Sequence, residues 1–487
     1  MSRVCLMLVV ALTCAGLAEA ADPADCGLSP SASAEANAKA LQRALDGGNC
    51  EVRIDRPGVY DLDRTVFLDS DTRLVFAEGV TIRKAKAYSN VFVNRGAYEG
   101  HSNSNITIRG LRLSVNGYEA IPPAGSPAQG LRGQVAFYRI DRARVEDFRC
   151  EDLGTSQYCI HFADFTDVAV ERFVIRGRKD GVHFNCGRGF VVRDGVIRTG
   201  DDAVAVNAGE WPGGCSPRIG CVENGVVEKL HVLPGTNGNI ARVITGSWKE
   251  WHPGMRLQRN DIVRRGKNVY AVFPMPLGTN ETVSLTGPTH EQGVWKSPEG
   301  ISFQFLQADG ATRAEIRNVV FRDIFCEGNY GIVCGWEVNT PYARLVHPEI
   351  PPADYPRIDI ALDNVVMDGR PGAPLLRGGA PATVRMNHVE CRTGPLVGMP
   401  AIDGYRGIRR TIVCTGTVLG RSPDEEFVFE SGDAEVDLHL SGCVATGPVF
   451  LTCRAPGKVR VHTRDDMTVE KRTVSDGRFA ELKAQWL

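Results

Sequence analysis

The feature that most constrains the fold is an internal repeat of 22 residues. The segment VAVERFVIRGRKDGVHFN, residues 168–185, matches FVVRDGVIRTGDDAVAVN, residues 190–207, when it is moved along the chain by that number. A period in the twenties built from short β-branched runs is the signature of a solenoid, in which each coil buries its apolar side chains against its neighbours. The shift superposes these pairs: His161 with His183, Val170 with Val192, Asp180 with Asp202, and Asn185 with Asn207.

Most of the remaining chain has the same character. Short β-branched runs separated by Gly, Asn and Asp recur from EVRIDRPGVYDL at residue 51 to RIDIALDNVVMDG at residue 357. Only residues 31–48 have helical periodicity, with Ser31 or Ser33 as the N-cap and a Gly-Gly pair as the stop. We therefore predict an all-β chain: a right-handed parallel β-helix, or solenoid, whose open end is capped by an N-terminal helix.

One segment interrupts the coils. Residues 248–310 break the coil period and contain three tryptophans, and Gly266-Lys267-Asn268 has the composition of a hairpin turn between two strands. We interpret 248–310 as an inserted small β module, which either helps to hold a polysaccharide or is a structural loop with its own small core. The predicted β-helix domain then comprises residues 21–247 and 311–487.

The first twenty residues read as a secretory signal peptide, with an early Arg, an apolar stretch and the small-residue ending Ala18-Glu19-Ala20. Cleavage is expected near Ala20. The apolar stretch is shorter than the roughly 20 residues that a membrane span needs. The sequence therefore predicts a secreted or periplasmic protein with no membrane partner.

Charge and cysteine usage limit the function further. The net charge of −2, with Lys and Arg spread throughout, gives no basic surface for nucleic acid. An exported chain meets oxidising conditions, so short-range disulfides are expected, while buried free thiols remain the alternative. The expected pairs, which leave over Cys186, are Cys26–Cys50, Cys150–Cys159, Cys215–Cys221, Cys326–Cys334, Cys391–Cys414 and Cys443–Cys453.

Aspartates directly precede two consecutive predicted strands. Asp180 precedes one alternating apolar run, and Asp201-Asp202 precede the next. Counterparts in successive coils lie one strand spacing apart, about 4.8 Å, so the three carboxyl groups should converge. Strict alternation would bury Asp180 and Asp202 among core valines, which is untenable for paired charges, so we place both at the bend before each strand.

Three converging carboxyl groups offer the acid and the base that cleavage of a glycosidic bond requires. Crowding of like charges also raises the pKa of one member, which lets an acid stay protonated near neutral pH. We weigh catalysis against a turn-stabilising or calcium-binding cluster, which oxygen-rich aspartate sites can also form.

The motifs KDGVHFN and TGDDAVAVN resemble those of the polygalacturonase family, glycoside hydrolase family 28, in which N-T-D-G is followed by G-D-D on a right-handed parallel β-helix. The resemblance covers roughly residues 35–247 and 311–420. It implies that Asp201 is the general acid, that Asp180 and Asp202 hold and activate the water, and that the anomeric configuration is inverted.

The chain departs from that family at two motifs. No G-H-G coil follows Gly200-Asp201-Asp202, so His183, or His161 below it, is a candidate for the missing imidazole, although a lone strand histidine is more often structural. The R-I-K motif, which grips a substrate carboxylate in that family, is matched only by Arg242, with Ile244 at the lysine position.

Further substrate-binding candidates have two interpretations each. Lys179 binds an anionic sugar or neutralises the aspartates. Trp211 and Tyr330 stack on a sugar face or pack in loops. For Asn185 and Asn207 we favour an asparagine ladder that satisfies backbone groups.

The sequence thus predicts a monomeric glycoside hydrolase that acts on a polysaccharide or oligosaccharide without a cofactor. One alternative is a polysaccharide lyase on the same fold, with Lys179, Arg178 or Arg242 as the base and calcium held by the aspartates. The other is a non-catalytic carbohydrate-binding protein, since one fold hosts unrelated functions.

Overall fold

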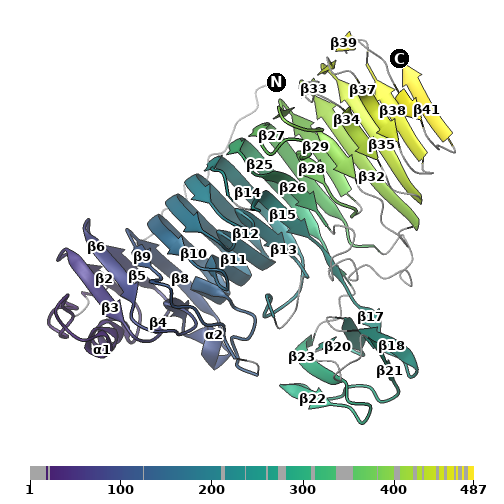
Figure 1. Ribbon diagram of the computed structural model, residues 1–487. Helices are drawn as coiled ribbons and strands as arrows, with labels where there is room; N and C mark the ends of the chain where they lie inside the picture. The colour runs from purple at the N-terminus through teal and green to yellow at the C-terminus, as the bar shows by residue number, and fades with distance from the viewer. Residues whose placement is uncertain are drawn as a thin grey trace, which may run out of the picture.

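The chain forms a right-handed parallel β-helix, as the repeat predicts (Figure 1). Successive coils stack along one axis from the N-terminal end to the C-terminal end of the tube, and a small lobe projects from the middle of the tube. The computed structural model describes residues 18–19, 22–123, 125–209, 214–235, 237–258, 261–272, 281–308, 313–335, 355–380, 382–399, 406–419, 425–429, 433–445, 449–453, 458–464, 468–469, 474–476 and 481–486.

Three parallel ladders of strands make up the wall of the tube. In each of three central coils a single long strand runs through all three ladders. These strands are β10 (Gly133–Leu153), β11 (Tyr158–Gly177) and β12 (Val182–Arg198). The first ladder, which concerns us most, pairs the starts of these strands with shorter ones on either side. Its other strands are β4 (Val66–Leu68), β7 (Phe92–Asn94), β13 (Val204–Asn207), β15 (Asn239–Ile244), β26 (Tyr330–Cys334), β28 (Leu376–Arg377), β31 (Val397–Met399), β34 (Glu425–Phe429), β37 (Val449–Cys453) and β40 (Val474–Asp476).

The second and third ladders close the tube. The second comprises β1 (Ala18–Glu19), β2 (Cys50–Ile54), β5 (Thr72–Phe76), β8 (Asn103–Arg109), β14 (Val222–Val232), β25 (Ile316–Glu327), β27 (Ile358–Asp368), β29 (Ala382–Asn387), β32 (Arg406–Thr415), β35 (Asp433–Ser441), β38 (Lys458–Thr463) and β41 (Glu481–Trp486). The third comprises β3 (Gly58–Leu62), β6 (Val80–Lys84), β9 (Arg112–Ser114), β30 (Glu390–Cys391), β33 (Val418–Leu419), β36 (Val444–Ala445) and β39 (Thr468–Val469).

The long strands bend where the backbone becomes left-handed. Residues stacked at the same register position in successive coils have φ between 50° and 58°, a conformation that Asp and Asn tolerate better than most residues. This explains the Asp and Asn residues between the β-branched runs of the sequence. One such column is Asp147, Arg172, Asp194, Lys229, Asp323, Asn364 and His388.

The core is a stack of inward-facing side chains, as the alternation in each run predicts. The rings of Phe137, Phe162 and Phe184 lie over one another in successive coils, with centroids 5.2 Å and 5.6 Å apart and interplanar angles of 10°. All three are fully buried, and fully burying a Phe side chain is worth about 1.5–3 kcal/mol. This stack holds the coils in the register that the 22-residue shift predicts.

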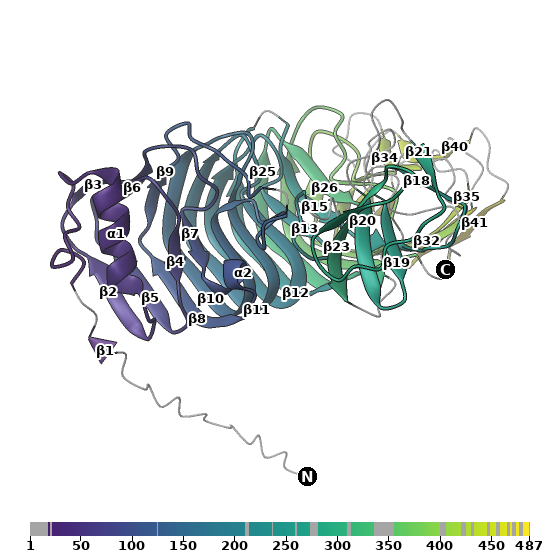
Figure 2. The same cartoon turned by 90° about the horizontal axis from the view of Figure 1, so that it is seen from below.

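Helix α1 (Ala34–Leu45) caps the N-terminal end of the tube (Figure 2). Its N-cap is Ser33, whose hydroxyl accepts a hydrogen bond from the backbone N–H of Ala36. Leu41 and Leu45 are fully buried in the same core as the coils. The second helix, α2 (Gly96–Glu99), is a single turn that follows β7.

The described strands between Lys249 and Ala308 form the lobe in the middle of the tube. The antiparallel pair β16 (Gly246–Ser247) and β24 (Arg313–Ala314) forms its stem, and Gly266-Lys267 is the turn between β19 and β20, as the sequence predicts. The lobe has its own core, which includes Leu257, Tyr270 and Phe303. Its strands are β17 (Lys249–Glu250), β18 (Met255–Gln258), β19 (Ile262–Arg265), β20 (Asn268–Val272), β21 (Glu281–Ser284), β22 (Val294–Lys296) and β23 (Ser302–Ala308).

The expected disulfides are not seen among the described cysteines. The twelve cysteines whose side chains are described are all thiols with no disulfide among them, and ten of the twelve are buried. Cys150 is near enough to Cys159 to add to the rise in the pKa of the Cys159 thiol that burial causes, although no bond joins the two. The five expected pairs described in full are therefore not shown as disulfides, and their pairing stays a prediction. For Cys443–Cys453, the Cys453 side chain lies outside the described residues.

The expected signal peptide lies almost wholly outside the described residues. Within the described ranges, neither α1 nor α2 has the length and the apolar character that a membrane crossing requires.

Candidate active site

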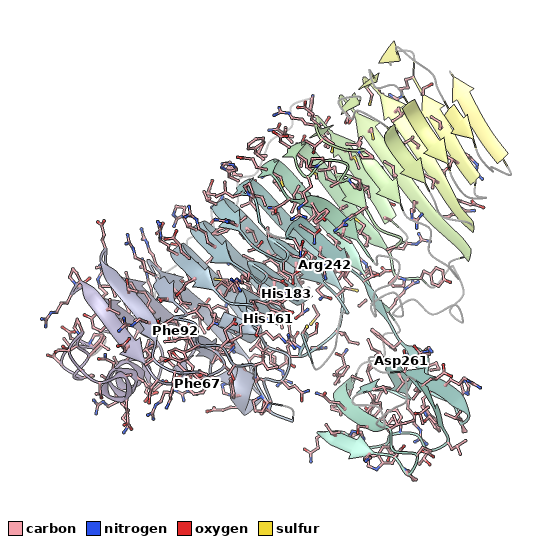
Figure 3. All side chains as sticks on the ribbon, in the orientation of Figure 1. Phe67, Phe92, His161, His183, Arg242 and Asp261 are labelled. Atoms are coloured by element: carbon pink, nitrogen blue, oxygen red, sulfur yellow. The ribbon has the colours of Figure 1, made fainter. Side chains whose placement is uncertain are left out.

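The candidate site is built from two adjacent columns of residues on the first ladder. Pairing between coils places Tyr158, Asp180, Asp202, Asn239 and Tyr330 in one column, at or just before the starts of the strands. The second column, three residues further along each strand, runs through His161, His183, Ala205, Arg242, Val333 and Arg377. Figure 3 shows His161, His183 and Arg242 in a row along the axis of the tube.

The three aspartates converge, as the 22-residue shift predicts. Each offers a carboxylate oxygen, and these oxygens all lie within 4.8 Å of one another. Asp180 and Asp202 lie at the bends before β12 and β13, where we expected them. Their side chains are only 5% and 3% exposed, whereas that of Asp201 is 23% exposed and is the one that reaches solvent.

Two cations balance the carboxyl groups. Lys179 forms an ion pair with Asp201, and its Nζ lies 3.5 Å from Oδ1 of Asp180. The guanidinium of Arg242 lies 3.0 Å from Asp202 and 3.5 Å from Asp201. Three oxygen ligands could in principle hold a divalent cation. Here the ammonium and guanidinium groups already contact those carboxylates.

Burial divides the three acids into two kinds. It raises the pKa of Asp180 to about 7, with the charge of Asp201 adding to the effect. Burial likewise raises the pKa of Asp202 to about 7. Partial burial of Asp201 acts in the same direction, but the charges of Lys179 and Arg242 outweigh it and hold its pKa below the usual range. Near neutral pH the cluster therefore combines one ionised carboxylate with two carboxyl groups able to hold a proton.

A chain of hydrogen bonds that begins in the preceding coil orients Asp180. Nδ1 of His161 accepts from the backbone N–H of Arg132 at 3.0 Å, so its proton is on Nε2, which donates to Oδ1 of Asn185 at 2.5 Å. The Asn185 amide lies 3.4 Å from Nε2 of His183, which leaves Nδ1 of His183 to donate to Oδ2 of Asp180 at 2.8 Å. We assign these tautomers from the network.

Burial also keeps both imidazoles neutral. It lowers the pKa of His161 and of His183 well below the ordinary histidine value, and the positive charge of Lys179 adds to this at His183. Because Nδ1–H of His183 donates to Oδ2, a proton on Asp180 must sit on Oδ1. That oxygen accepts no hydrogen bond from a described side chain.

The predicted substrate-binding residues differ in their exposure to solvent and in their contacts. Lys179 and Arg242 lie in the cluster with their side chains 23% and 25% exposed, so both can meet a substrate. His183 is only 2% exposed, so direct substrate binding is wrong for it, and it positions Asp180 instead. Tyr330 lies in the first column, partly exposed, with the guanidinium carbons of Arg370 and Arg377 4.7 Å and 4.6 Å from its ring centre. Trp211 lies outside the described residues.

Asparagine pairing occurs as expected, since the amide of Asn185 donates to the backbone oxygen of Asn207 at 2.9 Å. The ladder does more than satisfy backbone groups, however, because Asn185 also joins the two histidines. Arg178 is exposed, and no contact with the cluster is seen among the described residues.

Sequence reasoning missed three residues of the site. Tyr158 stacks on His183 with ring centres 4.1 Å apart. Asn239 donates to Oδ1 of Asp202 at 2.6 Å, and Arg377 donates to Oδ1 of Asn239 at 2.7 Å. A shift of 37 residues superposes DDAVAVN on GNIARVI and would have placed Asn239 beside Asp202.

No protein-family model matches the chain, and no curated protein matches its sequence. Among solved structures, the catalytic unit of a GH87 α-1,3-glucanase from Streptomyces thermodiastaticus is similar in fold, with a TM-score of 0.51 at 13% identity over 96% of this chain and 69% of that one. The family 28 exopolygalacturonase of Yersinia enterocolitica gives 0.47 at 13% identity over 91% of this chain and 78% of that one. The adhesin PfbA of Streptococcus pneumoniae gives 0.45 at 11% identity over 94% and 93%. Identities this low bear on the fold alone, which the glucanase unit and this chain share.

Proposed function

We propose that the protein is a glycoside hydrolase that cleaves a polysaccharide or oligosaccharide by acid and base catalysis. The observation that carries the proposal is the difference in exposure and in pKa among Asp180, Asp201 and Asp202. One carboxylate reaches solvent, and the pKa of each of the two buried carboxyl groups behind it is about 7, so near neutral pH one can hold a proton while the other is ionised. Glycosidic cleavage needs such a combination of a proton donor and a carboxylate. The fold shared with an α-1,3-glucanase unit agrees with this class of reaction.

In the proposed mechanism Asp201 meets the glycosidic oxygen, since it is the most exposed of the three. One oxygen of its carboxylate lies within 4.8 Å of a carboxyl oxygen of Asp180, so in this proposal the proton on Asp180 passes through Asp201 to the leaving oxygen. Asp202, whose pKa of about 7 leaves part of it ionised near neutral pH, is held by Arg242 and Asn239 and in its ionised form accepts a proton from the attacking water. Lys179 and Arg242 fix Asp201 in place and contact the sugar hydroxyl groups.

We predict inversion at the anomeric carbon. A retaining mechanism requires a second carboxylate to attack the sugar directly. The side chains of Asp180 and Asp202 are only 5% and 3% exposed, which leaves them too deeply buried for direct attack on a sugar. Proton NMR of the first product formed should show the anomer opposite to that of the substrate. Initial release of the same anomer would require a carboxylate that contacts the sugar, and would rule out this mechanism.

The experiment that tests the proposal is incubation with a panel of polysaccharides while reducing ends and ultraviolet absorbance are recorded together. We expect new reducing ends without an unsaturated chromophore, and the same rate in a chelator. The lyase alternative predicts both absorbance and chelator sensitivity. The nearby carboxylates Asp180 and Asp201 raise the pKa of Lys179 despite burial, which makes it a poor base for proton abstraction. Absorbing products, or no cleavage of any member, would overturn the proposal.

A further inference from the structure

A second cavity lies where the lobe meets the tube, away from the aspartates. Its volume is about 710 Å³, within the range of small-molecule sites. The tube contributes α2, the loop at 125–129 and Tyr138-Arg139, and the lobe contributes 291–294 and 304–306. Tyr138 is on the same outer face as His161, because Ala136 pairs with His161 and Tyr138 is the next outward residue of β10. The loop packs on Tyr138 through Ala128 and Leu131, and none of the three aspartates lines the cavity.

The two walls are joined by a buried pair of carboxamides. Gln129 of the tube donates to Oε1 of Gln304 of the lobe at 2.8 Å, and the two residues are only 7% and 8% exposed. A second link nearby is Gln307, which accepts from the N–H of Ile219 at 3.1 Å and donates to its carbonyl at 2.9 Å. The cavity is therefore held open between two tied surfaces.

Several polar groups of the cavity lining lack a partner. Oγ of Ser126 is buried and has no hydrogen bond among the described residues. No described group bonds the hydroxyl of Tyr138 or the amide nitrogen of Gln304, although these residues are only 5% and 8% exposed. A buried polar atom without a partner, such as Oγ of Ser126, calls for an explanation, and its position in one cavity lining with two further polar groups that are free to bond indicates a ligand.

The lining also indicates which chemistry would fit. One cation, Arg139, which stacks on Tyr138 at 4.8 Å, is balanced by one anion, Glu291. A phosphate or another strong anion would need more positive charge, and a lipid would leave the amides and hydroxyls unsatisfied. Hydroxyl and amide groups around the rings of Tyr138 and Phe305 suit a neutral pyranose, which presents hydroxyl groups at its edge and apolar C–H groups on its faces.

We propose that this cavity is a second carbohydrate site, which binds a neutral sugar unit of an oligosaccharide at a distance from the aspartates. The choice of a sugar rests on the proposed function, whereas the existence of the site rests on the lining alone. The site binds without cleaving, because Asp180, Asp201 and Asp202 lie elsewhere.

The test uses an array of neutral and acidic oligosaccharides and the full chain carrying Asp201→Asn, so that binding is read without turnover. We expect at least one neutral oligosaccharide to bind. Ser126→Ala combined with Tyr138→Phe should weaken that binding about tenfold, because two net hydrogen bonds are lost. The matched control, Tyr118→Phe, removes an exposed hydroxyl outside the cavity and should leave binding unchanged.

A second variant guards against a folding defect. Gln292 is exposed at the rim, so Gln292→Trp should narrow the mouth and abolish binding without disturbing the core. Absence of any bound oligosaccharide, or binding of the same strength in the double variant and in Gln292→Trp, overturns the second site. Neither outcome bears on hydrolysis, which is read with the unsubstituted chain on the polysaccharide panel.

Discussion

Replacing Asp201 with Asn should lower kcat by about 10²- to 10⁴-fold, the range in which a positioned acid or base contributes. The introduced amide can accept a hydrogen bond from Lys179 but cannot relay the proton of Asp180 to the leaving oxygen. The fold should persist, because Asp201 is partly exposed and Lys179 keeps its contact with Asp180. The measurement is kcat and KM on the best substrate of the panel, together with the midpoint of thermal unfolding.

Asp194→Asn is a matched control for that experiment. It makes the same chemical change at a carboxylate two bends along the same coil, where φ is 56°, a conformation that Asn tolerates. Asp194 is 41% exposed and 3.9 Å from Arg193, so its loss should leave kcat within about twofold and stability within about 0.5 kcal/mol. If Asp201→Asn retains more than about a tenth of the unsubstituted turnover, below the smallest usual effect of a general acid, Asp201 does not meet the reacting bond.

The central coils were predictable because three of them have nearly equal lengths. The shift of 22 residues is the register that pairs β11 with β12 and β12 with β13, so it places Asp180 beside Asp202 without any structure. Asp201 then follows from its neighbour. The bend before each strand was predictable on electrostatic grounds alone, since two charged groups cannot enter an apolar core.

The rest of the site was hidden by unequal coil lengths. Asn239 pairs with Asp202 across 37 residues, because more residues separate β13 from the following strand β14 than separate the corresponding segments of the coils before it. Arg377 reaches Asn239 from 138 residues away, across the lobe and a further loop. Such contacts depend on the lengths of the loops between strands. The periodicity of the β-branched runs does not predict those lengths.

Burial was the property least accessible from the sequence. His183 shares the outward column with Arg242, but Tyr158 covers the imidazole and makes it a partner of Asp180 instead of a ligand for sugar. The cysteines show the same limitation. Their spacing suggests pairs but does not show that their positions in the coils bury most of them among Phe, Val and Ile side chains.

The proton-holding aspartates should also make stability depend on pH. In the unfolded chain an aspartate titrates near 3.9, whereas the pKa of Asp202 in the fold is about 7. Between these values the folded protein binds more protons than the unfolded chain, so Asp202 contributes stability below about pH 4, and this contribution is lost as the pH rises to 7. Asp180 acts in the same direction. Asp201, with its lowered pKa, contributes stability that is lost only at acid pH, below this window.

Asp202→Asn isolates this effect because the amide mimics the protonated acid at every pH and keeps an oxygen for Asn239. Relative to the unsubstituted protein, the free energy of unfolding of the variant should rise by about 2–4 kcal/mol between pH 5 and pH 8, since each pKa unit corresponds to about 1.4 kcal/mol. Denaturant titrations at several pH values measure this difference, and the pKa of about 7 already includes the effect of the Arg242 guanidinium on the ionised form of Asp202. Asp194→Asn should give a curve parallel to that of the unsubstituted protein. Parallel curves for Asp202→Asn would mean that Asp202 is ionised throughout this range, and its pKa would then not be raised to about 7 by burial.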